Sequence, residues 1–201
     1  LDYGKSMQTE KIAIIKAGLQ STSYQHLDDT AGRESGKNRH VNVLGNELFS
    51  AYFTLAHKDR LSIIKMLSLD DLKFSINSTA FTIMEMMCIT PSIIDAIKIH
   101  ATLEFYTQSS LEGIINIVTN GKKQKKLRKL LLEACAIAAY RQSPYAIKQL
   151  IVDDAPQIKL ITQDIGVCWV HEGRHYKKLN PLFKHHKKLT DNFIEKVLGI
   201  L

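Results

Sequence analysis

Two pairs of adjacent aspartates are the residues of this 201-residue chain whose type and spacing could carry chemistry. Asp28-Asp29 ends a short strand pattern that starts at residue 24, and Asp153-Asp154 directly follows the apolar run 147–152. Acids held at the ends of two different strands can bind a pair of Mg²⁺ ions, which activates a water or a 3′-hydroxyl at a phosphodiester. The ordinary alternative is that each Asp forms a turn or, like Asp154 before Pro156, caps a helix.

The charge of the chain favours a polyanionic partner. Its formal net charge is +7, and twelve of its 27 Lys and Arg residues fall within 122–129 and 174–188. Such clustering fits DNA better than an even spread does, although a solvated helix face is the alternative for the first stretch. The candidate DNA contacts in that stretch are Lys122, Lys123, Lys125 and Lys126.

Composition limits the class of protein. Apolar residues make up 45% of the chain, which predicts a packed core, and no apolar run approaches the length of a membrane span. The three cysteines, Cys88, Cys135 and Cys168, are odd in number and far apart, so we expect a reducing cytosol and no disulfide framework. The first residues lack a signal-peptide pattern, and the missing initial Met suggests a fragment or an excised domain.

The elements that would position the aspartates begin with three strands. The patterns at 24–28, 40–44 and 49–55 are separated by the turn-rich gap 32–38 and a break at Gly45-Asn46, which predicts an antiparallel meander.

A helical segment follows. Thr90-Pro91 is a helix start, Ser110 is a candidate cap for the next helix, and Asn120-Gly121 is a helix end. Apolar stripes at helical spacing continue to about Pro144 and are expected to be core.

The chain then returns to strands. The run 147–152 is followed by a short helix opened by Ala155-Pro156, a buried strand at 166–170 and a helix over 185–201.

This order predicts an α/β chain with a ribonuclease H-like mixed five-stranded sheet and a large helical insertion between the third and fourth strands. The expected divisions are 1–67 and 144–201 for the two parts of the core and 68–143 for the insertion. In such a sheet the first and fourth strands are neighbours, so their carboxyl ends would bring Asp28 and Asp153 together.

Three blocks of sequence resemble bacterial insertion-sequence transposases of the DDE class. They are His26-Leu27-Asp28-Asp29-Thr30, the segment 152–157, and the segment 168–179 with its Cys168-Trp169-Val170-His171 start. The third is the most specific, because it is similar to the Cys-Trp-x-His-x-x-Arg element that follows the second catalytic strand in these enzymes. The resemblance runs from about Thr22 to the C-terminus.

The resemblance implies that Asp28 and Asp153 are the first two catalytic acids and metal ligands, with Asp29 and Asp154 as fallbacks. Family members cut and join DNA strands with two Mg²⁺ (or Mn²⁺) ions. They act on transposon ends and target DNA, commonly as homo-oligomers, and nothing points to a membrane partner. The implied location is the bacterial cytoplasm, in association with the nucleoid. The implied DNA contacts of the third block are His171, Arg174, His175, Lys177 and Lys178.

One part of the family pattern is missing. The third acid of the family is a Glu in an Asn-Asn-x-Ala-Glu context, and Glu195 within Asn192-Phe193-Ile194-Glu195-Lys196 matches it poorly. We therefore expect that the third acid was lost with a missing C-terminal part, and that the DNA-end-binding region is absent too. Such a chain, a remnant of a decayed element or an excised fragment, would be inactive or feebly active alone.

Two rival functions remain at this stage. His171-Glu172-Gly173-Arg174-His175 fits the His-Glu-x-x-His pattern of zinc metallopeptidases, but Gly173 disfavours a helix and no third ligand is evident. A non-catalytic DNA-binding module would use the basic stretches alone, and its binding would weaken steeply with salt.

Overall fold

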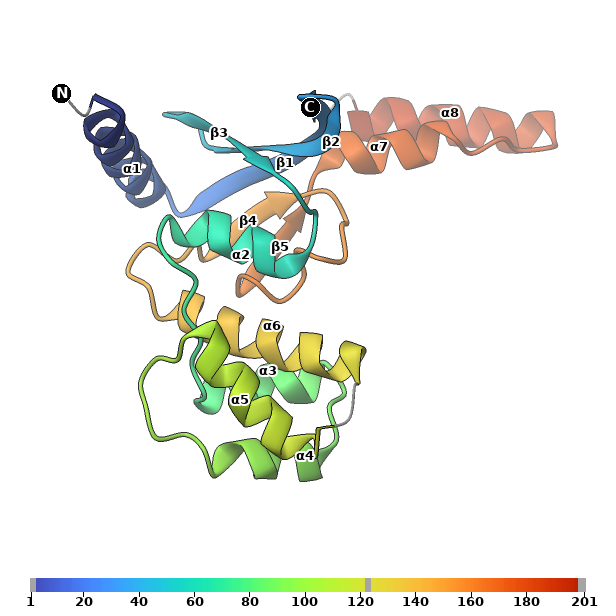
Figure 1. Cartoon of the computed structure of the whole chain (residues 1–201). Helices are drawn as coiled ribbons and strands as arrows, with labels where there is room; N and C mark the ends of the chain where they lie inside the picture. Colours follow the sequence, from blue (N-terminus) through green and yellow to red (C-terminus); the bar gives the residue numbers. More distant parts are fainter. Residues whose placement is uncertain (1–2, 122–123, 199–201) are drawn as a thin grey trace.

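The chain folds around one five-stranded mixed sheet (Figure 1). The computed structural model describes residues 3–121 and 124–198, and the statements below concern these residues. The strand order is β3-β2-β1-β4-β5. The elements are β1 (Tyr24–Glu34), β2 (Lys37–Gly45), β3 (Ser50–Leu55), β4 (Gln149–Val152) and β5 (Asp164–Val167). The first three strands pair antiparallel, whereas β4 is parallel to both β1 and β5, so the predicted mixed five-stranded sheet is confirmed.

The predicted meander is present, but its first two strands are longer than the sequence pattern suggested. The prediction that Asp28 and Asp29 end the first strand is wrong, because β1 continues to Glu34 and both residues pair with β2. The residues expected to form a gap pair with one another up to Glu34 opposite Lys37, and Ser35 and Gly36 make the turn with φ of 47° and 76°. Only these two residues need the left-handed conformation, so the polar character of the neighbouring residues reflects an exposed hairpin and not a loop.

Helix α1 (Tyr3–Ser21) was not predicted from the sequence. It buries Ile15 and Leu19, which are one helical turn apart. Its end is fixed by the side-chain amide of Asn46, which donates to the carbonyl oxygens of Gly18 (3.1 Å) and of the Gln25 side chain (3.0 Å). Asn46 therefore joins the end of α1 to the beginning of β1 and to the turn after β2.

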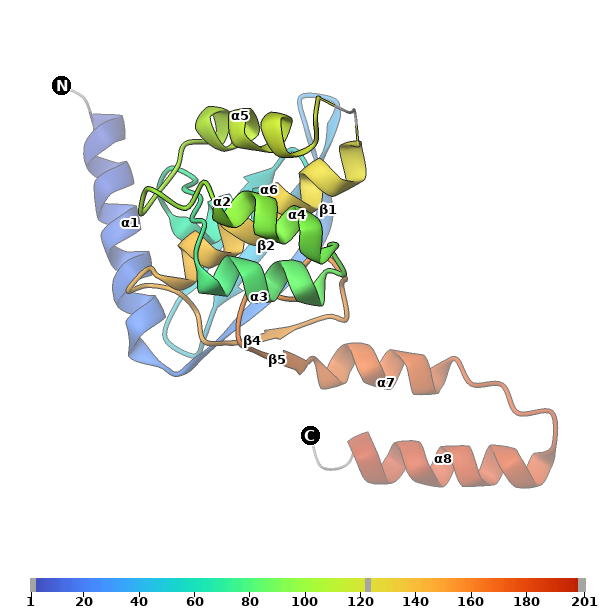
Figure 2. The ribbon, with the colours of Figure 1, turned by 90° about the horizontal axis from the view of Figure 1, so that it is seen from below.

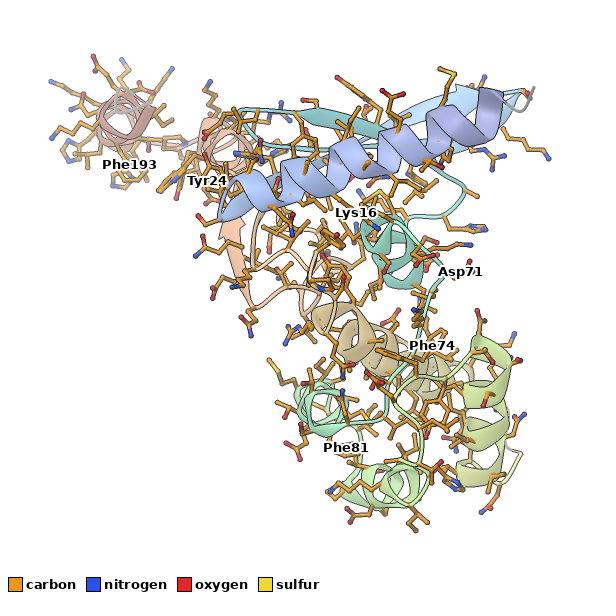
Figure 3. All side chains as sticks on the ribbon, turned by 90° about the vertical axis from the view of Figure 1, so that its left-hand side faces the viewer. Lys16, Tyr24, Asp71, Phe74, Phe81 and Phe193 are labelled. Atoms are coloured by element: carbon orange, nitrogen blue, oxygen red, sulfur yellow. The ribbon has the colours of Figure 1, made fainter. Side chains whose placement is uncertain are left out.

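The segment between β3 and β4 is helical, as predicted. It contains α2 (Arg60–Ser68), α3 (Ser78–Met86), α4 (Pro91–Lys98), α5 (Gln108–Val118) and α6 (Lys125–Arg141). In Figure 1, α3 to α6 form a layer below the sheet, and Figure 3 shows Phe74 and Phe81 in that layer. Helix α6 packs against α2, α3 and α5, and Leu131 and every residue from 133 to 140 are buried.

The predicted helix boundaries in this segment are partly right. Thr90 and Pro91 do begin α4, and α5 does end before Asn120 and Gly121, which have φ of 48° and 67°. The prediction that Ser110 caps α5 is wrong. Thr107 is the cap, because its side chain accepts a hydrogen bond from the Ser110 backbone N–H.

Two predictions for the last part of the chain are wrong. Residues 155–161 form turns and not a helix, because Leu160 has a left-handed φ of 74° and arginine side chains occupy several backbone carbonyls there. The strand expected at 166–170 is β5, which is exposed at the edge of the sheet and ends at Val167. Trp169 instead begins a helix.

The chain ends in two antiparallel helices, α7 (Trp169–Lys177) and α8 (Lys184–Leu198), which extend away from the body (Figures 1 and 2). They touch through Tyr176 and Phe193, whose rings meet edge to face with centroids 5.2 Å apart. Figure 3 shows Phe193 on this projection, beyond the sheet. Within the described ranges, no helix is both long and apolar enough to cross a membrane.

Candidate active site

The parallel pairing of β1 with β4 determines where the acidic pairs lie. The ladder ends with His26 opposite Ile151, so the same register carried two residues further places Asp28 beside Asp153. Because successive side chains alternate between the two faces of a strand, both aspartates belong to the face that His26 and Ile151 occupy.

The opposite face of these strands is the core. Leu27 and Val152, which precede the two aspartates, are 2% exposed. Burial of these two residues fixes the register, since a slip by one position would put an aspartate into the core.

A small, partly open cavity of about 130 Å³ lies where β4 ends beside β1. It is formed by β1, β4 and the beginning of α7, so it joins segments far apart in the sequence. Its lining residues are His26, Leu27, Asp28, Ile151, Val152, Asp153, Cys168 and His171. A larger cavity of about 760 Å³ lies between α1, β3 and α2, but Asp70 is the one acid among its described lining residues.

Helix α7 brings His171 to this cavity. The Cys168 N–H donates to the Val152 carbonyl at 2.7 Å, which anchors the start of the helix at the end of β4. The His171 N–H donates to the Cys168 carbonyl at 3.0 Å and so belongs to the first turn. Its ring atom Nδ1 is buried and has no hydrogen-bond partner among the described residues.

The two fallback acids are engaged elsewhere. Asp29 points to the other face of β1 and forms an ion pair with Lys58, with 2.6 Å between Oδ1 and Nζ. Asp154 is exposed and forms an ion pair with Lys159 at 2.9 Å. Neither lines the cavity, whereas Asp28 does and accepts a hydrogen bond from the Asp29 backbone N–H at 2.9 Å. Of the four aspartates, Asp28 and Asp153 line this cavity.

The segment after Asp153 is held by two arginines of the helical segment. Arg60 of α2 forms an ion pair with the buried Glu133 of α6 and donates to the carbonyls of Pro156 (2.9 Å) and Gln157 (3.2 Å). Arg141, at the end of α6, donates to the carbonyls of residues 160, 161 and 162 at 2.8, 3.2 and 2.8 Å. Sequence reasoning missed these residues. The one available signal was Glu133, an acid within an otherwise apolar helical stripe.

The other basic candidates within the described residues are exposed. Arg174, His175 and Lys178 follow His171 at helical spacing along one side of α7, and Lys177 lies on a neighbouring side. Lys125 and Lys126 lie at the start of α6 in the helical layer. They line a different pocket and are not among the lining residues of this cavity. Lys122 and Lys123 lie outside the described residues.

The zinc-peptidase hypothesis changes in one respect. The expectation that Gly173 disfavours a helix is wrong, because α7 runs through this residue and buries it. His171 faces the cavity while His175 is exposed, and within residues 3–121 and 124–198 no three His, Cys, Asp or Glu side chains form a ready metal-binding group.

The residues of the cavity suit a dication nonetheless. Two carboxylates without a basic partner in the cavity supply the oxygen ligands that Mg²⁺ and Mn²⁺ prefer, and a buried ring nitrogen lacks a partner beside them. Glu195 is exposed on α8 and does not line the cavity.

With this geometry in view, comparison with known proteins gives one relative. The chain is 28% identical over 170 residues to "Uncharacterized protein y4jO" of Sinorhizobium fredii (strain NBRC 101917 / NGR234). The match covers 84% of this chain and 52% of the relative, so the chain spans about half the relative's length. No family model matches the chain, and no solved structure matches it.

Proposed function

We propose that this chain is part of the catalytic region of a DDE-type DNA transposase and belongs to the ribonuclease H-like fold. The observation that carries the proposal is the placement of Asp28 and Asp153 in one cavity, where β4 ends beside the middle of its parallel neighbour β1. Acids from two strands of a rigid sheet are what a shared metal site at a phosphodiester requires.

The topology supports the finer fold assignment. Three antiparallel strands are followed, after a helical segment, by two strands that lie parallel to the first. This is the order expected for a ribonuclease H-like sheet in which α3 to α6 are inserted between the third and fourth strands.

In this proposal the residues have two roles, metal binding and contact with DNA. Asp28 and Asp153 would hold Mg²⁺ or Mn²⁺, which when bound supplies Lewis-acid activation of a water or 3′-hydroxyl. Arg174, Lys177 and Lys178 would contact DNA phosphates beside the cavity. Because the described part of the cavity contains two carboxylates, we expect this chain alone to bind metal but to join DNA strands feebly.

Metal binding tests the proposal directly. Titration with Mn²⁺, followed by electron paramagnetic resonance, would compare the chain with the double variant Asp28→Asn/Asp153→Asn. The matched control is Asp29→Asn/Asp154→Asn, which makes the same chemical change one residue further along each strand. We expect the first variant to lose at least about tenfold in affinity, because neutral amides are poor ligands for these ions. Unchanged Mn²⁺ binding in that variant would refute the two-acid site.

DNA binding supplies the second measurement. We expect the affinity of the chain for a DNA duplex to fall steeply with salt and to weaken in Lys177→Gln/Lys178→Gln. Salt-sensitive DNA binding without any metal binding would instead identify a non-catalytic DNA-binding module.

A further inference from the structure

The sheet has an open edge at β3. This strand pairs with β2 on one side and with no described strand on the other, and Figure 1 shows it at the edge of the sheet. Proteins usually shield such an edge with charged residues, proline, a bulge or a very short strand. The six residues Ser50–Leu55 include no charged residue and no proline, and their pairing with β2 is continuous. The opposite edge, β5, has four residues and begins with Asp164.

The hairpin between β2 and β3 determines which backbone groups face this edge. The Asn46 N–H donates to the Phe49 carbonyl at 3.0 Å. Because hydrogen-bonded pairs recur at every second residue of an antiparallel ladder, the odd-numbered residues of β3 bond to β2. The N–H and C=O groups of the even-numbered residues, Ser50, Tyr52 and Thr54, therefore point outward. No hydrogen bond within the described ranges uses these groups.

Apolar side chains lie beside the open edge. Tyr52 of β3 and Met7 and Ile14 of α1 are exposed. Together with Ser50 they help to line a hollow of about 460 Å³ between α1 and β3. Exposed apolar surface next to unpaired backbone groups marks an interaction site, because a further strand would pair with the backbone and cover the side chains at once.

A second copy of β3 matches this edge in length, spacing and charge. Antiparallel pairing about a two-fold axis at Tyr52 sets the two Tyr52 residues opposite each other, and it sets each Ser50 opposite the Thr54 of the second copy. Every outward N–H and C=O group of both strands then has a partner. The uncharged strand brings no like charges together, although the chain as a whole has a net charge of +7.

We propose that two copies of this chain pair antiparallel through β3, about a two-fold axis at Tyr52, and so form one continuous sheet. Closed two-fold pairing is the commonest symmetry of protein oligomers. The inference goes beyond the proposed function, because it depends on β3 and not on the aspartates. Strand β2 separates β3 from β1, so the pairing leaves the cavity of Asp28 and Asp153 uncovered in each copy.

Sedimentation velocity over a range of chain concentrations tests the pairing, and we expect a reversible equilibrium between the chain and a species of twice its mass. Tyr52→Lys places two ammonium groups face to face across the axis, whereas Tyr52→Pro removes an outward N–H and spares the bonds to β2. Each variant should raise the dissociation constant of the dimer at least about tenfold, because each substitution acts twice in a symmetric dimer.

Ile117→Lys on α5 is the matched control. Ile117 and Tyr52 are both 64% exposed, so the control adds the same charge at the same exposure but away from the edge. It should leave the dissociation constant unchanged. Circular dichroism would verify that each variant is folded.

Hydrogen exchange measured by nuclear magnetic resonance gives a second readout on the unmodified chain. The amides of Ser50, Tyr52 and Thr54 should exchange rapidly in dilute samples and at least about tenfold more slowly at concentrations that favour the dimer. The amides of Ala51 and Phe53 should be protected at every concentration, because they bond to β2.

Three results would overturn the proposal. A chain that stays monomeric at every concentration would leave the edge to a strand from another protein. A dimer whose dissociation constant is unchanged in both Tyr52 variants would place the interface elsewhere. Masses that grow beyond the dimer would indicate open assembly instead of closed two-fold pairing. The proposed function fails separately, since Mn²⁺ binding to Asp28 and Asp153 does not depend on β3.

Discussion

Removal of the Arg141 side chain should destabilise the protein clearly more than removal of an exposed arginine. Its guanidinium donates three hydrogen bonds to the carbonyls of residues 160, 161 and 162, within the connection from β4 to β5. The side chain is partly buried, and burial lowers its pKa from the ordinary value without removing its charge at neutral pH. Arg141→Ala therefore leaves three backbone acceptors without their donor.

The magnitude follows from the geometry. A hydrogen bond from a charged donor contributes roughly 1.5–3 kcal/mol, but three bonds from one partly exposed group are not additive. Two of them are 2.8 Å and the third is 3.2 Å, so we expect a loss of about 3 kcal/mol in the free energy of unfolding. For a domain of this size that corresponds to a fall in Tm of about 6–12 °C.

Thermal and urea unfolding followed by circular dichroism would measure this loss. Arg141→Lys should recover about half of it, because one ammonium keeps the charge but not the planar fork. The control is Arg174→Ala on the exposed face of α7, which should change stability by less than about 0.5 kcal/mol. If Arg141→Ala proved no more destabilising than Arg174→Ala, the reasoning that this guanidinium holds the β4–β5 connection would be refuted.

Three further predictions concern other parts of the molecule. Asp29→Asn should cost about 1 kcal/mol of stability by removing the Lys58 ion pair, yet leave Mn²⁺ affinity unchanged in titrations. Gly45→Ala should lower the free energy of unfolding measured in urea by at least about 2 kcal/mol, because its Cβ would lie 2.3 Å from a backbone oxygen, whereas Gly113→Ala, with open space on α5, should raise it by about 0.5–1 kcal/mol. Burial raises the pKa of the Cys135 thiol from 9.0 to about 12, so the unfolded chain releases this proton first and stability should fall with rising pH between these values. For one group the free energy of unfolding falls by about 1.4 kcal/mol per pH unit. Urea unfolding of Cys135→Ala at several pH values should show this dependence reduced by that amount.

Periodicity predicted the sheet well because its signal is local. Alternation over 49–55 identified a strand whose Ala51 is buried and whose Ser50, Tyr52 and Thr54 are exposed. The same local signal placed Asp153-Asp154 correctly after β4, but it wrongly placed Asp28-Asp29 at the end of β1, which continues to Glu34 through its pairing with β2.

The errors have a common physical origin in contacts distant along the chain. Residues 155–161 have a helical start signal at Pro156, but arginines from α2 and α6 bind their carbonyls and hold them in turns. Helix α1 has weak amphipathic patterning and depends on Asn46 for its position. The sequence kept Asp29 as a fallback for Asp28 for the same reason, because the Lys58 partner of Asp29 is distant along the chain.

Helix α6 connects the helical segment closely to the rest of the fold. Its residues 133–140 are buried, and it packs on α2 beside the sheet and on α3 and α5 below it. Its Glu133 pairs with Arg60 of α2, and its Arg141 binds the connection from β4 to β5. A helix that belongs to two layers cannot be cut out without opening both, so the layers should melt in one cooperative transition. The segment 68–143 therefore supports the sheet through α6. Deletions that spare the five strands but remove α6 should leave no folded core.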